Sequence, residues 1–275
     1  MRSLWKPGTS VPTRIHTSAD KEKSSPKGAK TNITNTTITH KERKVKVLDL
    51  NILYNMDCMD GMKQFPDNYF DLAIVDPPYF SGPEKREYYG KRISTTGIER
   101  RNYHVSKEWK VPDDAYFKEL FRVSKNQIVW GCNYYNYLFP GSGRIIWDKC
   151  NGASSFSDCE IAYCSLHDSV RLFRYMWNGM MQGKSISEGH IMQGNKSLNE
   201  HRIHPTQKPV ALYEWLITRY AKKDDIILDT HVGSASSLIA CHNLNYAYVG
   251  FEIDKHYYEL ATRRMNEHFS QLRLF

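Results

Sequence analysis

The tetrapeptide Asp76-Pro77-Pro78-Tyr79 combines residue types that could hold an amine during a reaction. It follows the apolar run LAIVD (72–76), which predicts a buried parallel strand ending at an acid. The two prolines fix φ and remove two backbone N–H donors, so the turn is expected to offer a carboxylate and unpaired backbone carbonyls but almost no donors. Such a cup suits an amino group with two hydrogens, and the ring of Tyr79 could stack on a flat heterocycle.

The exocyclic amine of a nucleobase fits this cup. Its lone pair is delocalised into the ring, which makes the nitrogen a poor nucleophile. Hydrogen bonds from the amine to Asp76 and to the carbonyl of Pro77 would favour the pyramidal nitrogen needed for attack, which is a form of electrostatic catalysis. We therefore expect a catalytic site at Asp76, Pro77, Pro78 and Tyr79, although an ordinary proline-rich turn after a strand is the alternative for this motif alone.

A second motif, DTHVGSAS (229–236), follows the run IILD (226–229) and opens a predicted helix. A turn of small residues at this place lets a ligand approach backbone amides at the helix N-terminus. Glu252 lies nineteen residues beyond Gly233, close to the spacing at which an acid binds ribose hydroxyls in dinucleotide-binding folds. The single glycine makes a weak motif, but the turn, the spacing and the acid together favour a cofactor that contains a nucleoside.

A third motif, HPTQKP (204–209), precedes a run with apolar residues at helical spacing (209–221). Thr206 or the nearby backbone could cap this helix, and a helix N-terminus attracts a carboxylate. A well-made helix start explains the motif equally simply. Taken singly, His204 and His231 are also more often structural than catalytic.

The elements that must position these motifs are short apolar runs alternating with helical patterns. The pattern predicts an α/β fold with a doubly wound, mostly parallel sheet. Two long segments, 80–112 and 168–203, fit neither pattern and would emerge at the sheet edge where ligands bind. The expected strands cover 51–56, 72–76, 127–131, 144–148, 160–166, 226–229 and 247–254, and the expected helices cover 209–221, 236–244 and the residues after 254.

Charge is unevenly distributed along the 275 residues. The formal net charge is +8, but residues 1–46 alone hold eleven Lys/Arg against three Asp/Glu, so the rest of the chain has no net charge. This first segment is rich in Ser, Thr, Lys, Asn and Pro and is expected to be a disordered basic tail, either an arm that holds phosphates or a leader without a role. Pro7, Gly8 and Pro12 disfavour a transit peptide. Residues 47–275 are expected to form the catalytic domain.

The composition excludes several classes of protein. The sequence has no run of eighteen apolar residues and no apolar region of the kind found in secretory signals, so a cytoplasmic protein is expected. The six cysteines never form a CxxC pair, which disfavours a zinc knuckle or a disulfide scaffold and predicts reduced thiols. No metal site and no membrane partner are expected.

The three motifs in this order resemble the amino-group DNA methyltransferases that use S-adenosyl-L-methionine. With DPPY first and the cofactor turn last, the order resembles their β class, and the resemblance covers roughly residues 51–268. It implies a seven-stranded, Rossmann-like methyltransferase sheet that the chain enters in permuted order. It also implies that segments 80–112 and 168–203 contact DNA.

The resemblance also implies a role for each motif residue. Glu252 would bind the ribose hydroxyls, and Asp57 would lie near the cofactor adenine. The target base would be held by Asp76, Pro77 and Tyr79. The methionine end of the cofactor would be lined by Asp229, Gly233 and Ser234, and its pocket would be closed by Thr206, Gln207 and Lys208.

The sequence departs from the family pattern in the cofactor turn. Thr230 and His231 stand where the family usually has Pro-Phe, so His231 would touch the cofactor and could change its affinity. Ala235 stands where a second glycine is usual. Alanine is still small, so the packing of helix against strand should survive.

The leading hypothesis is a site-specific DNA methyltransferase that transfers a methyl group to N6 of an adenine flipped out of double-stranded DNA. Cytosine-N4 methylation uses the same amine chemistry, but by family resemblance cytosine enzymes more often carry Ser in place of Asp76. The same acceptor-rich turn would also fit the substrate of an RNA or protein amide methyltransferase. A non-catalytic DNA-binding module whose cofactor turn has decayed is the alternative from another class. A homodimer and a restriction endonuclease, as in restriction-modification, stay open as protein partners.

Overall fold

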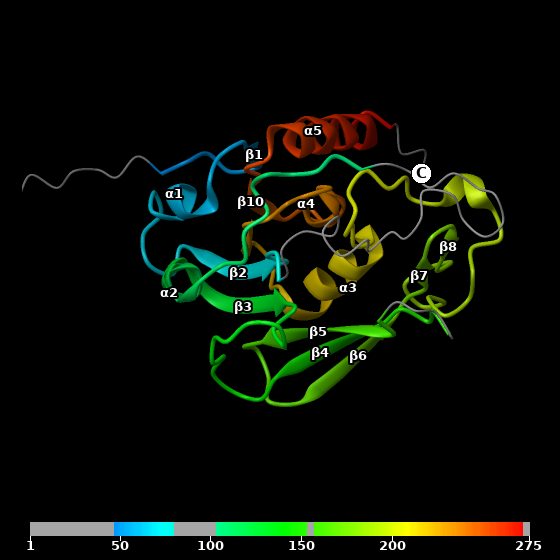
Figure 1. Cartoon of the computed structure of the whole chain (residues 1–275), viewed down its shortest axis with the longest axis horizontal. Helices are drawn as coiled ribbons and strands as arrows, with labels where there is room; N and C mark the ends of the chain where they lie inside the picture. The colour runs from blue at the N-terminus through cyan, green and yellow to red at the C-terminus, as the bar shows by residue number, and fades with distance from the viewer. Residues whose placement is uncertain (1–46, 80–102, 153–156, 272–275) are drawn as a thin grey trace, which may run out of the picture. The chain divides into compact units, whose positions relative to one another are not determined.

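The computed structural model describes residues 47–79, 103–152 and 157–271 (Figure 1). The chain divides into two units, Met1–Arg43 and Lys44–Phe275, and the described residues all belong to the second. The predicted basic tail, 1–46, and the first part of the predicted DNA-contacting segment, 80–102, lie outside the described residues. None of the described helices is long and apolar enough to cross a membrane.

An eight-stranded sheet forms the centre of the described chain, in the order β1-β10-β9-β2-β3-β5-β4-β6. All pairings are parallel except those of β5 with β3 and β4, so β5 alone runs against the rest. The strands are β1 (Ile52–Tyr54), β2 (Phe70–Val75), β3 (Ser124–Trp130), β4 (Arg144–Asp148), β5 (Cys159–Cys164), β6 (Val170–Arg174), β9 (Ile226–Asp229) and β10 (Ala247–Phe251).

The predicted mostly parallel α/β fold is confirmed. The strand count exceeds the predicted seven because β6 pairs in parallel with β4 at the edge of the sheet. This strand lies within 168–203, a segment predicted to lack regular structure. The same segment also contains a hairpin of β7 (Trp177–Asn178) and β8 (Met181–Gln182), and a short 3-10 helix, η2 (Lys196–Leu198).

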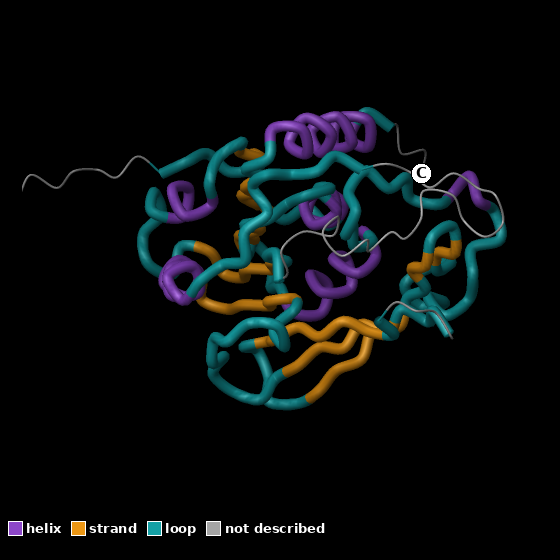
Figure 2. The backbone as a smooth tube through the Cα atoms, in the orientation of Figure 1, coloured by secondary structure: helices purple, strands orange, loops and turns teal. Residues whose placement is uncertain are grey.

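Helices cover both faces of the sheet (Figures 1 and 2). Leu72 and Ile74 of β2 pack in the core with α3, α4 and α5, whereas Ala73 and Val75 pack on the other face with α1 and α2. Because both faces are buried, β2 reads as a continuous apolar run rather than an alternating one. The helices are α1 (Cys58–Met62), α2 (Asp114–Val123), α3 (Val210–Tyr220), α4 (Ser236–Asn243) and α5 (Lys255–Phe269).

The turn between β9 and α4 contains an alanine in a left-handed conformation. Ala235 is the N-cap of α4, with φ 64° and ψ 20°, and its side chain is fully buried. A left-handed backbone costs a residue with a Cβ atom about 1–2 kcal/mol, and glycine avoids that cost. The packing expected for a small residue survives, as predicted, but the alanine strains the backbone of the turn.

We expect Ala235→Gly to destabilise the protein less than Ala240→Gly does. Both alanines are fully buried, so each variant loses one methyl contact and gains chain entropy in the unfolded state. Only the first variant also relieves a left-handed backbone, and its loss of unfolding free energy in urea should be smaller by about 1–2 kcal/mol. Equal losses in the two variants would contradict the assignment of strain to Ala235.

Candidate functional site

The ends of parallel strands place the three sequence motifs at one edge of the sheet. Asp76 follows β2, the turn that starts with Thr230 follows β9, and Glu252 follows β10, all in parallel with one another. The strand β5 runs the other way, so its first residues, including Glu160, reach the same edge. Side chains distant in sequence therefore meet here.

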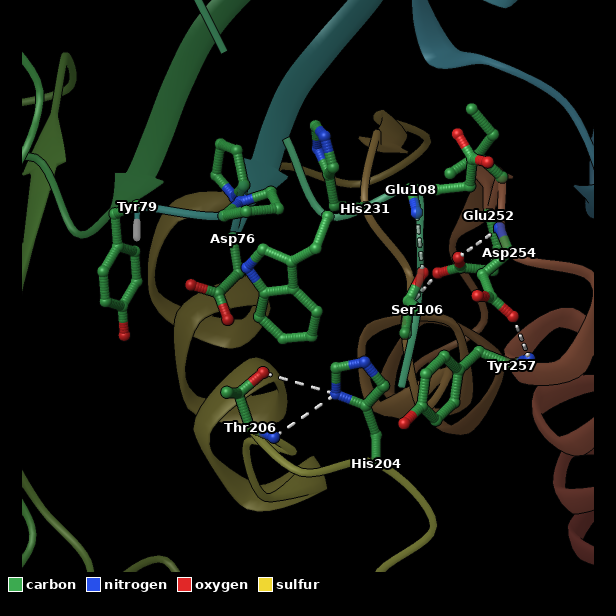
Figure 3. Close-up of a pocket in the computed structure, with 15 residues that line it drawn as sticks. Asp76, Tyr79, Ser106, Glu108, His204, Thr206, His231, Glu252, Asp254 and Tyr257 are labelled. Atoms are coloured by element: carbon green, nitrogen blue, oxygen red, sulfur yellow. Dashed lines mark hydrogen bonds between the residues drawn. The ribbon is translucent and has the colours of Figure 1, made fainter. Parts of the chain in front are cut away.

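One cavity at this edge joins the catalytic motif to the cofactor turn (Figure 3). Eight of the predicted site residues line it: Asp76, Pro77, Pro78, Tyr79, Thr206, His231, Gly233 and Glu252. The close-up view shows Asp76 and Tyr79 on one side and Glu252 on the other, with His231 between them. A group bound by the turn can therefore face a group bound by Asp76.

Five predicted site residues do not line this cavity. Asp57 caps α1, where its side chain accepts the N–H of Met59 at 2.7 Å. Gln207 is buried, and its amide oxygen accepts the N–H of Ile203 at 2.9 Å. The other three are also buried and do not line the cavity: Lys208, Asp229 and Ser234.

The Asp76 carboxylate presents one engaged oxygen and one buried, unsatisfied oxygen. Its Oδ2 atom lies 2.5 Å from Nζ of Lys208, while its Oδ1 atom is buried without a hydrogen-bond donor among the described residues. A buried acceptor without a donor is costly, typically about 1–3 kcal/mol. Oδ1 is therefore a prepared position for a donor that enters with a ligand.

The carbonyl of Pro77 is less free than the sequence suggested. The hydroxyl of Tyr135 donates to this oxygen at 2.6 Å, so the expectation of unpaired carbonyls in the turn is wrong for Pro77. Sequence reasoning could not find the donor, which lies fifty-eight residues away. A carbonyl oxygen has two lone pairs, so a second donor can still be accepted.

Tyr79 is held in place by the end of β3. Its ring stacks on Tyr134, with centroids 4.6 Å apart and planes inclined by 7°. Gly131 has φ +69°, and a Cβ atom there would lie 2.4 Å from Cδ1 of Tyr79. A glycine at this position is what permits the close approach of the ring to the backbone.

The cofactor turn is organised around two buried carboxylates. Glu252 accepts the N–H of Gly233 at 2.8 Å and that of Asp254 at 2.9 Å, one on each oxygen, and burial raises its pKa to about 7. Asp229 accepts the N–H of His231 at 3.0 Å and the hydroxyl of Ser237, and burial raises its pKa to about 6. Asp229 thus stabilises the turn through these two hydrogen bonds without lining the cavity, whereas Glu252 lines it.

Both histidines of the motifs are neutral in this setting. Burial lowers the pKa of His231 to about 4 and that of His204 to about 3. His231 exchanges a hydrogen bond with the hydroxyl of Thr230 at 2.9 Å. His204 uses Nδ1 to contact the hydroxyl of Thr206 at 3.3 Å. Near neutral pH, neither imidazole adds a positive charge to the cavity.

The start of α3 differs from the prediction. Its N-cap is Pro209, which makes no side-chain capping bond, so the proposed cap by Thr206 is wrong. Glu200 instead accepts the N–H of Val210 at 2.9 Å. A carboxylate from the chain therefore already meets this helix N-terminus, where a ligand carboxylate was considered.

Seven cavity residues were not among the predicted site residues: Ser106, Glu108, Trp109, His204, Ile253, Asp254 and Tyr257. The indole of Trp109 stacks on His204 at 5.7 Å, with planes inclined by 10°. Five residues before Trp109, the carbonyl of His104 accepts the hydroxyl of Tyr257 at 2.7 Å. The segment 103–112, predicted to contact DNA, thus forms a wall of the cavity.

Some of these residues had a sequence signal. Asp254 precedes α5 and accepts the N–H groups of His256 and Tyr257, a capping pattern that an acid before an amphipathic helix indicates. Nothing comparable marks Trp109, because it lies in a segment without periodicity and reaches the cavity only through tertiary contacts.

We expect the stability of a Glu252→Gln variant, relative to wild type, to improve as pH rises. Because burial raises the pKa of Glu252 from 4.5 to about 7, the stability linked to its protonated form is present below pH 4.5 and lost as pH rises through 7. Glutamine does not titrate, so its unfolding free energy relative to wild type should gain about 3 kcal/mol between pH 4.5 and 8. Urea denaturation at several pH values measures this difference.

The matched control for this prediction is Glu259→Gln, an exposed carboxylate of α5 that pairs with Lys255. This control should show no comparable change with pH. A Glu252→Gln difference that stays constant with pH would contradict the prediction.

Comparison with known proteins connects this site to a family. Residues 70–263 match the family model of the N6/N4 methyltransferases, described as DNA methylases. The type II methyltransferase M.HpaI of Haemophilus parainfluenzae is 26% identical over 250 residues, which span 78% of this chain and 74% of the relative. M2.MboI of Moraxella bovis is 27% identical over 247 residues, with 78% and 87% covered.

A solved structure of M1.HpyAVI in complex with S-adenosylmethionine aligns with a TM-score of 0.45 and 20% identity, covering 77% of this chain and 98% of that one.

The family model matches more than half of the chain, and its span includes both the Asp76 corner and the cofactor turn. The chain therefore belongs to the N6/N4 amino DNA methyltransferase family.

Proposed function

We propose that this protein transfers a methyl group from S-adenosyl-L-methionine to the N6 amine of an adenine flipped out of double-stranded DNA. The observation that carries the proposal is the shared cavity, in which the unsatisfied Oδ1 of Asp76 and the Glu252 turn face the same space. Such an arrangement can hold an amine and a methyl donor together.

The charges around the cavity favour a cationic methyl donor. Four carboxylates line it, and the described lining residues include no lysine or arginine (Figure 3). The carboxylates are Asp76, Glu108, Glu252 and Asp254. A sulfonium is attracted to such a surface, whereas a phosphate would be repelled. With two neutral histidines beside it, the cavity suits S-adenosyl-L-methionine better than a dinucleotide.

The residues present fit the parts of this donor. Glu252 has lone pairs left on both oxygens after its two backbone contacts, and they can accept ribose hydroxyls. His231 would lie near the sulfonium without repelling it, because its imidazole is neutral. When bound, the donor supplies an electrophilic methyl group on a positively charged sulfur.

The chain's own residues then orient the amine. Oδ1 of Asp76 would accept one amine hydrogen and the second lone pair of the Pro77 carbonyl would accept the other, which directs the nitrogen lone pair toward the turn. Negative charge at Asp76 stabilises positive charge that develops on the nitrogen and can hold the departing proton. Positioning of two reactants in this way can supply up to about 7–11 kcal/mol of the barrier reduction.

Adenine is proposed over cytosine because the first residue of the motif is Asp76. By family resemblance, cytosine-N4 enzymes more often carry serine there. The amine chemistry is the same for both bases, so the choice between them is settled by identifying the product.

Two segments are proposed to contact DNA, 80–112 and 168–203. In the second, the described part exposes Arg171, Arg174, Lys184 and Lys196, which can contact phosphates. It also exposes apolar side chains, including Met180 and Leu198. The described part of the first segment lines the cavity wall, so its DNA contacts would come from 80–102.

We expect Asp76→Ala to slow methyl transfer to DNA strongly while the methyl donor still binds. Loss of one preorganised electrostatic contact typically lowers kcat by about 100- to 1000-fold. Transfer of tritiated methyl groups to DNA measures the rate. Calorimetry measures the affinity for the methyl donor, which should fall by far less than the rate, because three other carboxylates still line the cavity. The control is Asp67→Ala, an exposed aspartate that pairs with Arg122 away from the cavity.

The product distinguishes the remaining functions. Mass spectrometry of digested, methylated DNA should detect N6-methyladenine. N4-methylcytosine would replace the adenine proposal with the cytosine one. Transfer to RNA or to protein but not to DNA, or donor binding without any transfer, would overturn the proposal.

A further inference from the structure

A row of four charged residues, all largely buried, begins at Asp76 and leads away from the cavity. We define this charge chain as Asp76, Lys208, Glu160 and Lys149, in which acids and bases alternate. Nζ of Lys208 lies 2.5 Å from Oδ2 of Asp76 and 2.8 Å from Oε2 of Glu160, and Nζ of Lys149 lies 2.6 Å from Oε1 of Glu160. Each side chain is less than one-fifth exposed, and Lys208 is only 2% exposed.

Only the first member of the charge chain touches the cavity. Lys208, Glu160 and Lys149 do not line it, so they act on a ligand through Asp76. Lys208 comes from the HPTQKP motif before α3, Glu160 from β5 and Lys149 from the end of β4. The face of Trp130 lies 5.6 Å from Nζ of Lys208, which closes another side of the ammonium group.

We propose that Lys208 and Glu160 are positioning residues that set both the orientation and the ionisation of the Asp76 carboxylate. This inference rests on the proposed function, because it assigns the two residues to the acceptor of the target amine. The bond from Lys208 to Oδ2 fixes the plane of the carboxylate and leaves Oδ1 for the amine. The charge of Lys208 keeps that carboxylate negative in a place where water cannot.

The two residues act on Asp76 with opposite signs. Burial raises the pKa of Asp76, the ammonium of Lys208 lowers it, and the carboxylate of Glu160 raises it again. Lys149 lowers it from the far end of the charge chain. Removing Lys208 therefore favours a protonated Asp76, and removing Glu160 favours an ionised one.

Four further titratable groups face Asp76 and must be accounted for. One of them, Glu252, lies across the cavity, has a pKa raised by burial to about 7 and titrates within the assay range. Tyr135 and Tyr213 are buried, which raises the pKa of each far above the assay range, so both stay neutral. Asp229, at the end of β9, has a pKa raised by burial to about 6 and titrates at the acid end of the range. Because Asp229 and Glu252 are present in wild type and in every variant, their contributions cancel when pH profiles are compared.

The experiment measures the single-turnover rate of methyl transfer from pH 5 to 9, with DNA and S-adenosyl-L-methionine both saturating. In Lys208→Gln, the acid limb of the profile should move up by at least one pH unit. The rate at pH 7 should fall at least tenfold and recover toward pH 9. In Glu160→Gln, the acid limb should move down, with little change at pH 7.

The controls separate this role from a structural one. Lys125→Gln removes an exposed lysine that pairs with Asp71 at the opposite end of β2, and its profile should match that of wild type. Donor affinity by calorimetry should stay within threefold in all variants, because neither positioning residue lines the cavity. If Lys208→Gln does not fold, Lys149→Gln should show an upward shift of smaller size.

Two results would overturn the inference. Profiles of Lys208→Gln and Glu160→Gln that shift in the same direction would show that their charges do not act on Asp76. An equal loss of rate at every pH would show a merely structural role. Absence of transfer by the wild-type protein would instead overturn the proposed function, so the two failures are distinguishable.

Discussion

Parallel strands end at a common edge, and every part of this site depends on that constraint. Asp76, the cofactor turn and Glu252 come from the ends of β2, β9 and β10, which are neighbours in the sheet. Within the described eight-stranded sheet, β5 runs against the other strands, so the beginning of β5 lies at the same edge and contributes Glu160. A site built from four strands needs no long loop to bring its central side chains together.

The acidic character of the cavity has an energetic cost that a ligand can offset. Burial raises the pKa of Glu252 to about 7, which means that its charged form is held against unfavourable desolvation. The unsatisfied Oδ1 of Asp76 adds a further cost in the free protein. A cationic donor and a hydrogen-bonding amine would relieve these costs, so the features that weaken the free protein are those that favour its proposed ligands.

The sequence could predict the site only where strand ends carry a signal. The acid-proline corner after a buried run and the small-residue turn with Glu252 were found from local patterns, and the structure places both on one cavity. The partner of Lys208 was not found, because Asp76 lies 132 residues away and the motif alone indicated a helix start. Trp109 and Tyr135 were missed for the same reason, since nothing in a local pattern reports a tertiary contact. The helix α2 was not predicted, although its sequence carries a signal. Four apolar or aromatic residues recur at helical spacing and are buried: Tyr116, Phe117, Leu120 and Val123.

The charge chain is better explained by its effect on Asp76 than by a contribution to stability. Removing ions from water costs several kcal/mol per ion, and apolar replacements of buried ion pairs often leave a fold equally stable. The four charged residues of the charge chain are therefore expected to contribute little to the stability of the packing among β2, β4, β5 and α3. They do supply a cation, Lys208, next to the carboxylate of Asp76, which shares the cavity with three other carboxylates. The ammonium of Lys208 opposes the rise in pKa that burial causes at Asp76. It does so before any methyl donor arrives, so this effect does not depend on the order in which ligands bind.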